Sequence, residues 1–267
     1  MNRRQLLAST LAAPAWAGPA ALRSSSAPQA EASPSREYYE LRFYHLRRGP
    51  QTKLMDDFLE TAAIPAWNRL GISPVGVFRV TVGPQNPSLY VLLPSKSLET
   101  LVLPGTRLAA SGEMAKASAF WDAPAPSPAY IRQESSLMMA FETFPRLEVP
   151  AGAAEKRPRI FELRTYESHS EKAHLKKIEM FNQGEISIFR RTGLRAVFFG
   201  DSLIGPRLPN LTYMLVFDDL AARDKAWSAF VADPEWKKLS TAPGYTDGEI
   251  VSNITNLLLS PAPYSQI

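Results

Sequence analysis

The sequence contains an internal repeat that covers most of its length. "YELRFY" at residues 39–44 returns as "FELRTY" at residues 161–166, an offset of 122 residues. The same offset continues without a gap through further identical residues: Arg69 and Arg191, Gly71 and Gly193, Gly83-Pro84 and Gly205-Pro206. Self-similarity at a fixed period indicates repeated structural units. The chain must therefore fold as two copies of one small unit.

The repeat divides the chain of 267 residues into four segments. We assign residues 1–35 to a signal peptide and linker, and residues 36–145 to the first repeat. A Pro-containing linker, 146–157, precedes the second repeat, 158–262. Each repeat is long enough to bury a core of its own.

Both repeats show the same order of elements. The first strands are predicted at 38–46 and 160–167, each followed by a helix. The later strands are predicted at 75–82, 89–93 and 137–144 in the first repeat, and at 196–204, 211–217 and 250–259 in the second. With a second helix before the last strand, as at 221–231, the order is βαββαβ, the ferredoxin-like unit. We therefore predict an α+β fold of tandem ferredoxin-like repeats packed sheet to sheet.

Several helix ends can be placed from local signals. Gly71 and Gly193 suit the C-terminal ends of the first helices. The spacing of Ser168 and Glu171 suits a capping box. Asp233-Pro234 suits an N-cap and first helical position, with Trp227 and Trp236 nearby expected to pack in the core.

The repeated first strand alternates between two kinds of side chain. One row is mainly apolar: Tyr39, Leu41 and Phe43, then Phe161, Leu163 and Thr165. The other row is Glu-x-Arg-x-Tyr: Glu40, Arg42 and Tyr44, then Glu162, Arg164 and Tyr166. We expect the apolar row to pack under the helices and the charged row to face the interior between the halves. Charges there are costly unless paired, so each Glu should neutralise the Arg two residues later.

Two interpretations of the charged row are open. It is either an ion-pair network that fixes how the sheets associate, or part of a cavity for a small ligand. In the cavity, an Arg binds a carboxylate or enolate oxygen, a Tyr donates a hydrogen bond and a Glu takes a proton. The ligand-binding candidates are Glu40, Arg42, Tyr44, Glu162, Arg164, Tyr166 and Asn210. Asn210 suits the adjacent turn equally well, and no catalytic residue is assigned.

The motif Gly200-Asp201-Ser202-Leu203 matches the name-giving string of a family of esterases. A serine nucleophile needs a histidine base, which that family places downstream. No histidine follows His174, and the repeat aligns the motif with an ordinary strand segment at residues 78–81. We therefore expect Ser202 to be structural.

No metal or cofactor site is expected. The chain has no cysteine and three histidines, His45, His169 and His174, without the spacing of metal ligands. We expect a surface role for each, and a haem ligand at His45 or His174 is a weak alternative. The net charge of +4 falls to +1 without the first thirty residues, so nothing favours a nucleic-acid partner.

The N-terminal segment predicts export. Arg3-Arg4 followed by the apolar run 6–17 resembles a bacterial twin-arginine signal, with Ala15-Trp16-Ala17 as one cleavage candidate. We expect a periplasmic or secreted protein that meets the twin-arginine translocase during export. No apolar run of about 20 residues predicts a transmembrane segment.

Three stretches of the second repeat, "FELRTY", "FFGDSLIGPRLPNLTYMLVF" and "FVADPEWKKLS", together resemble the NIPSNAP family of the dimeric α/β-barrel superfamily. The resemblance is weaker over residues 36–145. It implies a dimeric α/β-barrel-type unit, whereas no reaction is established for the family. Cofactor-independent oxygenases, isomerases and haem-degrading enzymes occur elsewhere in the superfamily.

Three functions follow from these expectations. The first is an exported protein that binds a small apolar or acidic ligand between the repeats. The second is a cofactor-independent oxygenase or isomerase, and the third is a structural or interaction protein with a filled interior. Fold alone does not choose among them, and a homo-oligomer is left open.

Overall fold

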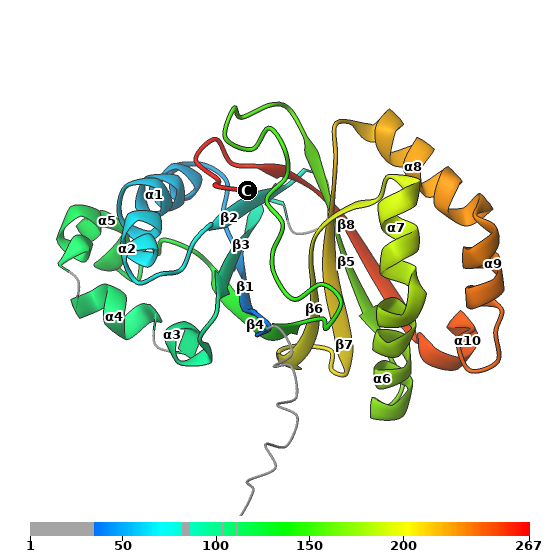
Figure 1. The fold of residues 1–267 in the computed structure, drawn as a ribbon. Coiled ribbons are helices and arrows are strands. Elements are labelled where there is room, and N and C mark those ends of the chain that lie inside the picture. The colour runs from blue at the N-terminus through cyan, green and yellow to red at the C-terminus, as the bar shows by residue number, and fades with distance from the viewer. Residues whose placement is uncertain (1–34, 82–85, 103, 111) are drawn as a thin grey trace, which may run out of the picture. The chain divides into compact units, whose positions relative to one another are not determined.

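Eight antiparallel strands close into one barrel (Figure 1). The computed structural model describes residues 35–81, 86–102, 104–110 and 112–267. The strands are β1 (Tyr38–His45), β2 (Gly76–Val80), β3 (Ser88–Ser95), β4 (Arg132–Ala140), β5 (Ile160–Glu167), β6 (Arg195–Ile204), β7 (Asn210–Phe217) and β8 (Asn253–Pro261). Their order around the barrel is β1-β3-β2-β8-β5-β7-β6-β4, and β4 pairs with β1. The expected barrel of two joined sheets is therefore present.

The two halves of the barrel meet along strand edges. Each half contributes four contiguous strands in the same spatial order, and β2 pairs with β8 where Val80 lies opposite Leu259. On the other side β4 pairs with β6, and Ala140 lies opposite Gly200. Closure pairs the backbone groups that a sheet edge would otherwise leave open. We call these two junctions the seams.

Helices cover the outside of the barrel in two groups. The first group is α1 (Pro50–Phe58), η1 (Leu59–Ala63), α2 (Ile64–Arg69), α3 (Leu98–Val102), α4 (Pro104–Ala110), η2 (Glu113–Ala117) and α5 (Ser118–Trp121). The second is α6 (Glu171–Met180), η3 (Phe181–Glu185), α7 (Ile186–Thr192), α8 (Leu220–Ala232), α9 (Pro234–Ser240) and α10 (Asp247–Ile250). Figure 1 shows the groups on opposite sides of the barrel. Each repeat therefore covers its own sheet.

The repeat extends to an irregular helical turn. Both η1 and η3 are π-helical, and they begin at Leu59 and Phe181, again 122 residues apart. Gly193 ends α7 with a φ of 88°, as predicted, and Gly71 follows α2 with a φ of 81°. Glycine takes this left-handed conformation without the steric cost of a Cβ.

The predicted orientation of the first strand is wrong. The apolar row faces the barrel interior, where Tyr39, Leu41 and Phe43 join one buried cluster with Phe161 and Leu163. The charged row points outward under the helices. Its members pack against helical aromatic residues: Arg42 lies 5.2 Å from the ring of Trp67, and Tyr166 packs with Phe181. Both faces of the strand are buried, so alternation separates two rows without indicating which one faces the helices.

The fourth strands begin and end elsewhere than predicted. β4 runs over Arg132–Ala140 rather than 137–144, and β8 over Asn253–Pro261 rather than 250–259. The start of β4 is polar and therefore lacked a strand pattern. Phe141 and Phe144 continue the apolar pattern beyond its end because they pack with Phe181 and Phe199 of the second half.

One predicted helix cap is wrong and another is confirmed. Ser170, not Ser168, is the N-cap of α6, and its Oγ accepts a bond from the Ala173 amide at 3.2 Å. Ser168 instead donates to the carbonyl of Ile250 at 2.7 Å. Asp233 caps α9 with Pro234 in the first helical turn, as expected.

Candidate functional site

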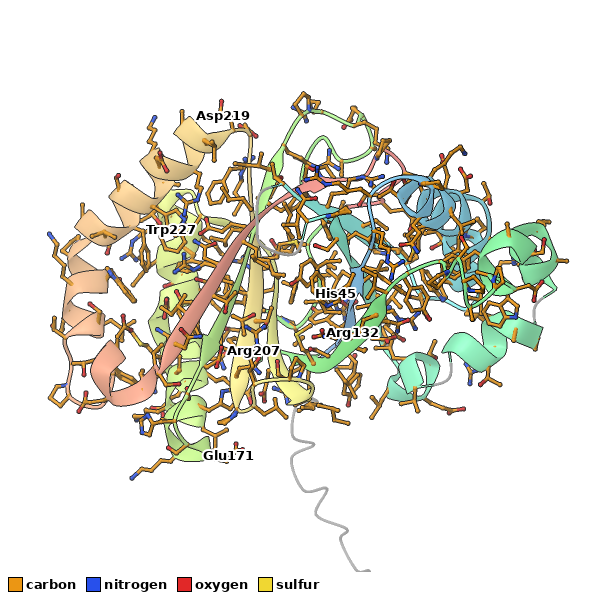
Figure 2. The ribbon with its side chains drawn as sticks, turned by 180° about the vertical axis from the view of Figure 1, so that it is seen from behind. His45, Arg132, Glu171, Arg207, Asp219 and Trp227 are labelled. Carbon is orange, nitrogen blue, oxygen red and sulfur yellow. The ribbon has the colours of Figure 1, made fainter. Side chains whose placement is uncertain are left out.

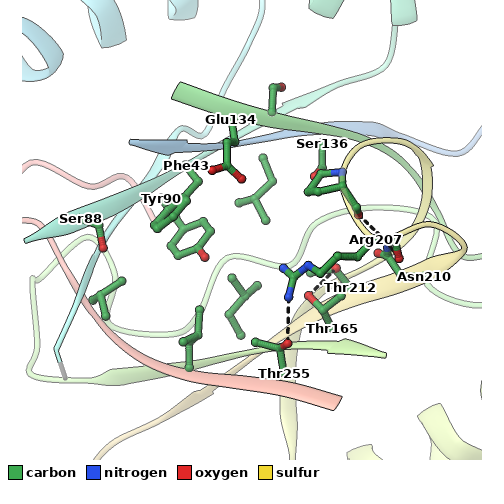
Figure 3. A pocket seen from close by; sticks show the side chains of 16 residues that line it. Phe43, Ser88, Tyr90, Glu134, Ser136, Thr165, Arg207, Asn210, Thr212 and Thr255 are labelled. Atoms are coloured by element: carbon green, nitrogen blue, oxygen red, sulfur yellow. Dashed lines mark hydrogen bonds between the residues drawn. The ribbon is translucent and has the colours of Figure 1, made fainter. Parts of the chain in front are cut away.

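A cavity of about 440 Å³ lies inside one end of the barrel (Figure 3). All strands except β6 contribute to its wall, as does the turn between β6 and β7. Its polar and aromatic lining includes Phe43, Ser88, Tyr90, Glu134, Thr165, Arg207, Asn210, Thr212 and Thr255. Leu41, Val80, Leu163 and Leu257 form the apolar part of the wall. We call this cavity the barrel pocket.

Strand register places the same three positions of each repeat in the barrel pocket. In the first half, Phe43 lies opposite Tyr90 on β3 and Glu134 on β4. In the second half, the equivalent Thr165 lies opposite Thr212 on β7 and Thr255 on β8. Residues directly opposite on antiparallel strands point to the same face of the sheet. The repeat therefore builds two facing walls from equivalent positions with different chemistry.

The first wall is aromatic and acidic. Phe43 and Tyr90 stack with ring centroids 4.4 Å apart and an interplanar angle of 21°. His45 Nε2 lies 2.8 Å from Glu134 Oε1, and the ring of His45 meets Phe43 edge-on at 4.3 Å. Burial, with a smaller contribution from Glu134, raises the pKa of Tyr90 to about 12 although Arg207 opposes the shift. Tyr90 therefore keeps its proton at neutral pH and can donate a hydrogen bond.

The second wall carries hydroxyls and a cation. Thr165 and Thr212 are hydrogen-bonded at 2.9 Å, and Arg207 Nη1 donates to Thr255 Oγ1 at 3.0 Å. Arg207 sits in the β6–β7 turn with a φ of 60°, and its closest carboxylate oxygen, on Glu167, lies 3.7 Å away. A guanidinium held in this way can bind the oxygens of an acidic ligand.

Asn210 links the wall to the turn. Its Nδ2 donates to the carbonyls of Pro206 and Arg207, each at 3.0 Å, and its Oδ1 accepts from Ser202 Oγ at 2.7 Å. The side chain is 3% exposed and lines the barrel pocket. Asn210 thus holds the turn that presents Arg207, as the structural interpretation predicted.

The other six predicted site residues lie outside the barrel pocket. In the first half, Arg42 pairs with Glu40 at 2.8 Å, as expected, and Ser135 Oγ also donates to Glu40 at 2.8 Å. Tyr44 packs in the cluster under α1 and α2 with Trp67. The predicted pairing of Glu40 with Arg42 is confirmed, whereas the predicted orientation of these side chains toward the barrel interior is wrong.

In the second half the charged row forms a hydrogen-bonded network. Glu162 is fully buried and accepts hydrogen bonds from Arg164, from Arg223 at 2.7 Å and from Trp227 Nε1 at 2.8 Å. Burial acts to raise the pKa of Glu162, but these three donors outweigh it and hold the pKa below its usual value. Tyr166 bonds to Tyr213 at 3.0 Å. Trp227 therefore packs partly in the core, as expected, and its indole also donates to the buried carboxylate of Glu162.

Most of the barrel pocket was missed by sequence reasoning. Figure 2 labels His45, Arg132 and Arg207, which come from separate strands and turns at the pocket end of the barrel. One signal could have found the pocket: positions where the aligned repeats exchange residue type, such as Tyr90 with Thr212 and His45 with Glu167. The two copies of a duplicated fold keep similar core residues. Positions where the copies carry different kinds of residue are therefore candidates for a role other than core packing.

Two other motifs have structural partners. His174 is 3% exposed and pairs with Asp201 at 2.8 Å, so its predicted surface position is wrong. The partner had no sequence signal because Asp201 lies on β6, 27 residues further along the chain. Ser202 faces Asn210, as its structural assignment requires. Within the described residues no three His, Asp or Glu side chains are grouped as a metal site.

None of the helices in the described part of the chain is long and apolar enough to cross a membrane. The predicted export signal, with Arg3 and Arg4, lies outside the described residues.

Comparison with known proteins agrees with the repeat. The model of the NIPSNAP family matches residues 39–142 and again residues 161–266. No curated protein matches the chain.

Two solved structures share the fold at low sequence identity. A proposed monooxygenase from Fusobacterium nucleatum is 8% identical, with a TM-score of 0.55, over 85% of this chain and 93% of that one. A second proposed monooxygenase, from Lactobacillus acidophilus, is 9% identical, with a TM-score of 0.54, over 85% of this chain and 94% of that one. An uncharacterised NIPSNAP-like domain protein from Burkholderia xenovorans is 22% identical over 41% of this chain and 90% of its own, with a TM-score of 0.37.

Proposed function

Because the chain belongs to the NIPSNAP family through both of its halves, we propose that it uses the barrel between them to bind one small, largely apolar molecule with an acidic group. The observation that carries this proposal is the pair of unlike walls in the barrel pocket. The stacked Phe43 and Tyr90 suit a planar ring, and Arg207 suits an anionic oxygen. A pocket that is mostly apolar with a few convergent polar groups is the usual form of a small-molecule site.

Binding of matched aromatic probes tests this proposal. Calorimetric titration with 1-naphthoate and with uncharged naphthalene should show tighter binding of the carboxylate. Arg207→Gln should weaken naphthoate binding by about tenfold or more, because a charge-assisted bond contributes on the order of 2 kcal/mol, and should leave naphthalene unchanged. Arg190→Gln is the matched control, since Arg190 pairs with Glu148 on the outer surface. Equal affinities of the two probes, or an unaffected Arg207→Gln variant, would contradict the proposal.

An enzyme of the cofactor-independent oxygenase or isomerase type is the second candidate. The pair of His45 and Glu134 at the pocket supports it, because a carboxylate and an imidazole in contact can accept a proton. Two structures with the same fold are described as proposed monooxygenases. Turnover of a bound ligand, followed by mass spectrometry with and without oxygen, distinguishes this candidate from binding alone.

The third candidate, a structural protein with a filled interior, is the weakest because the barrel encloses about 440 Å³ at one end. The ferredoxin-like description of each half is part of the proposal. The shared strand orders β4-β1-β3-β2 and β8-β5-β7-β6 support it.

Export to the periplasm or the medium through the twin-arginine translocase is also proposed, on the strength of Arg3 and Arg4 and the apolar run after them. Replacing both arginines with lysine should hold the protein in the cytoplasm. Cell fractionation measures this, and secretion of the variant at the normal rate would argue against the route.

A further inference from the structure

We propose that His45 and Glu134 together accept the proton of an acidic hydroxyl on the ligand, so that a phenol or enol is held in the barrel pocket as its anion. This inference rests on the proposed ligand-binding function. It adds a chemical class to the ligand and assigns a proton-accepting role to two residues.

The geometry makes Glu134 available to a ligand. Its Oε1 pairs with His45 Nε2 at 2.8 Å, which leaves the second carboxylate oxygen for another donor. Figure 3 shows the Glu134 carboxylate directed into the cavity from β4, with Tyr90 on the same wall. The His45 side chain is 13% exposed, and that of Glu134 is 38% exposed. Glu134 therefore touches the cavity, and His45 supports it from behind.

The charged and titratable groups around Glu134 come from its own strand, from β1, from β3 and from the β6–β7 turn. Arg132 Nη1 on the same strand lies 3.7 Å from Glu134 Oε1, and His45 approaches from β1. Glu134 and Arg207 both act on the pKa of Tyr90, in opposite directions, so the Tyr90 hydroxyl lies within the influence of both. The ring of a ligand stacked on the aromatic wall would therefore have a base near one edge and a guanidinium across the cavity.

The proton balance favours a hydroxyl acid over a carboxylic acid. A carboxylate would bring a second negative charge to the pocket beside Glu134. A phenol or enol arrives neutral: its O–H bond breaks, the proton joins the Glu134–His45 pair, and the oxygen becomes an anion beside the protonated pair, with Arg207 across the cavity. The pair loses one negative charge and the ligand gains one, so the net charge of the pocket is unchanged.

A chromogenic phenol tests the inference on the full-length protein. The probe is 4-nitrophenol, whose anion absorbs visible light, titrated into the protein at a pH well below the solution pKa of the probe. The wild-type protein should bind the probe as its yellow anion. Binding should raise the ionisation constant of the probe by about tenfold or more, which lowers its pKa by about one unit. Glu134→Gln keeps the shape and the contact with His45, and should bind the probe without colour.

Controls separate the role of the charge from a general loss of structure. Glu148→Gln makes the same change at an exposed ion pair with Arg190, outside the barrel pocket, and should keep the yellow complex. Glu134→Gln should still bind 1-naphthoate, and more tightly than wild type, because that probe has no proton to give and the negative charge is gone.

The outcomes are distinct. A wild-type protein that binds the phenol without colour overturns the inference and leaves the proposed function intact. Colour that persists in Glu134→Gln overturns the assignment of the base. If neither probe binds wild type, the proposed function fails first.

Discussion

Glu162 shows what holds the outer face of the barrel to its helices. Arg164 comes from β5 itself, whereas Arg223 and Trp227 come from α8, and all three donate to one carboxylate that is fully buried. A buried charge is tolerated when its partners are complete, and removal of one partner leaves the others uncompensated. The carboxylate thus connects a strand to the helix that covers it.

Glu162→Gln should destabilise the protein by on the order of 3 kcal/mol, because Arg164 and Arg223 lose their buried carboxylate. Urea unfolding followed by tryptophan fluorescence measures the loss. Glu148→Gln, at an exposed pair with Arg190, is the control and should be near neutral. Equal stability of the two variants would show that the network adds little.

The same residue predicts a pH dependence. Burial opposes the shift, but hydrogen bonds from Arg223, Trp227 and Arg164 hold the pKa of Glu162 below its usual value. Its contribution to stability is therefore complete above the unfolded pKa of about 4.3 and is lost as the pH falls through the lower folded pKa. The difference in Tm between wild type and Glu162→Gln should be constant near neutral pH and shrink in acid. A difference that stays constant down to about pH 2 would be inconsistent with this linkage.

For single residues, the sequence predicts which charged side chains pair better than it predicts which face of the sheet they occupy. The partners Glu40–Arg42 and Glu162–Arg164 follow from a spacing of two on a strand, which places both side chains on one face. Which face is inside depends on helices such as the one that carries Trp67, and no local pattern reports that contact. Arg207 and Glu134 were missed for the same reason: strand register far along the chain brings them into one cavity.

The elements show how closely the two repeats still correspond. The π turns η1 and η3 occupy the same place in both copies, as do Gly71 and Gly193 after them. π turns often persist at positions with a functional or packing role. The first helical segment of each repeat has therefore kept its shape while the pocket walls have diverged.

Gly193→Ala should cost about 1 kcal/mol, because alanine is strained at a φ of 88° although its nearest contact would be an ordinary 3.8 Å. Thermal unfolding by circular dichroism measures this. Gly248→Ala is a matched control, because a Cβ there meets nothing within 4 Å and its φ is not in the left-handed range. A cost at Gly248 equal to that at Gly193 would refute the conformational explanation.

Element boundaries were predictable where one face is apolar and failed where the strand is polar. The first strand of the second repeat was placed at its observed bounds, Ile160–Glu167. β4 was misplaced because Arg132–Ser136 is a polar segment that faces the pocket rather than a core. A strand segment that is polar on both faces lacks the amphipathic pattern on which such predictions depend.

Among the residues described, the two seams decide whether one half is stable alone. Without its partner, the second half would expose the edges of β6 and β8, and Ile267 would lose its buried place beside Gly76. Unpaired edges associate readily with another chain.

The isolated second half, residues 158–267, should therefore form a homodimer that rebuilds a barrel from two identical sheets. Size-exclusion chromatography with light scattering measures its mass. A stable, folded monomer would show that the seams are dispensable.

The divergence of the two halves within one chain also removes a degeneracy in how a ligand can bind. In a barrel of two identical sheets, a ligand turned end for end meets the same contacts, and the two poses have equal free energy. Here Tyr90 and Thr212 occupy equivalent positions on the two walls, as do Glu134 and Thr255. Reversal of the ligand therefore exchanges a ring for a hydroxyl at one position and a carboxylate for a hydroxyl at the other. The pocket can therefore bind an asymmetric ligand in one preferred orientation. Any chemistry carried out in this pocket should yield a single regioisomer.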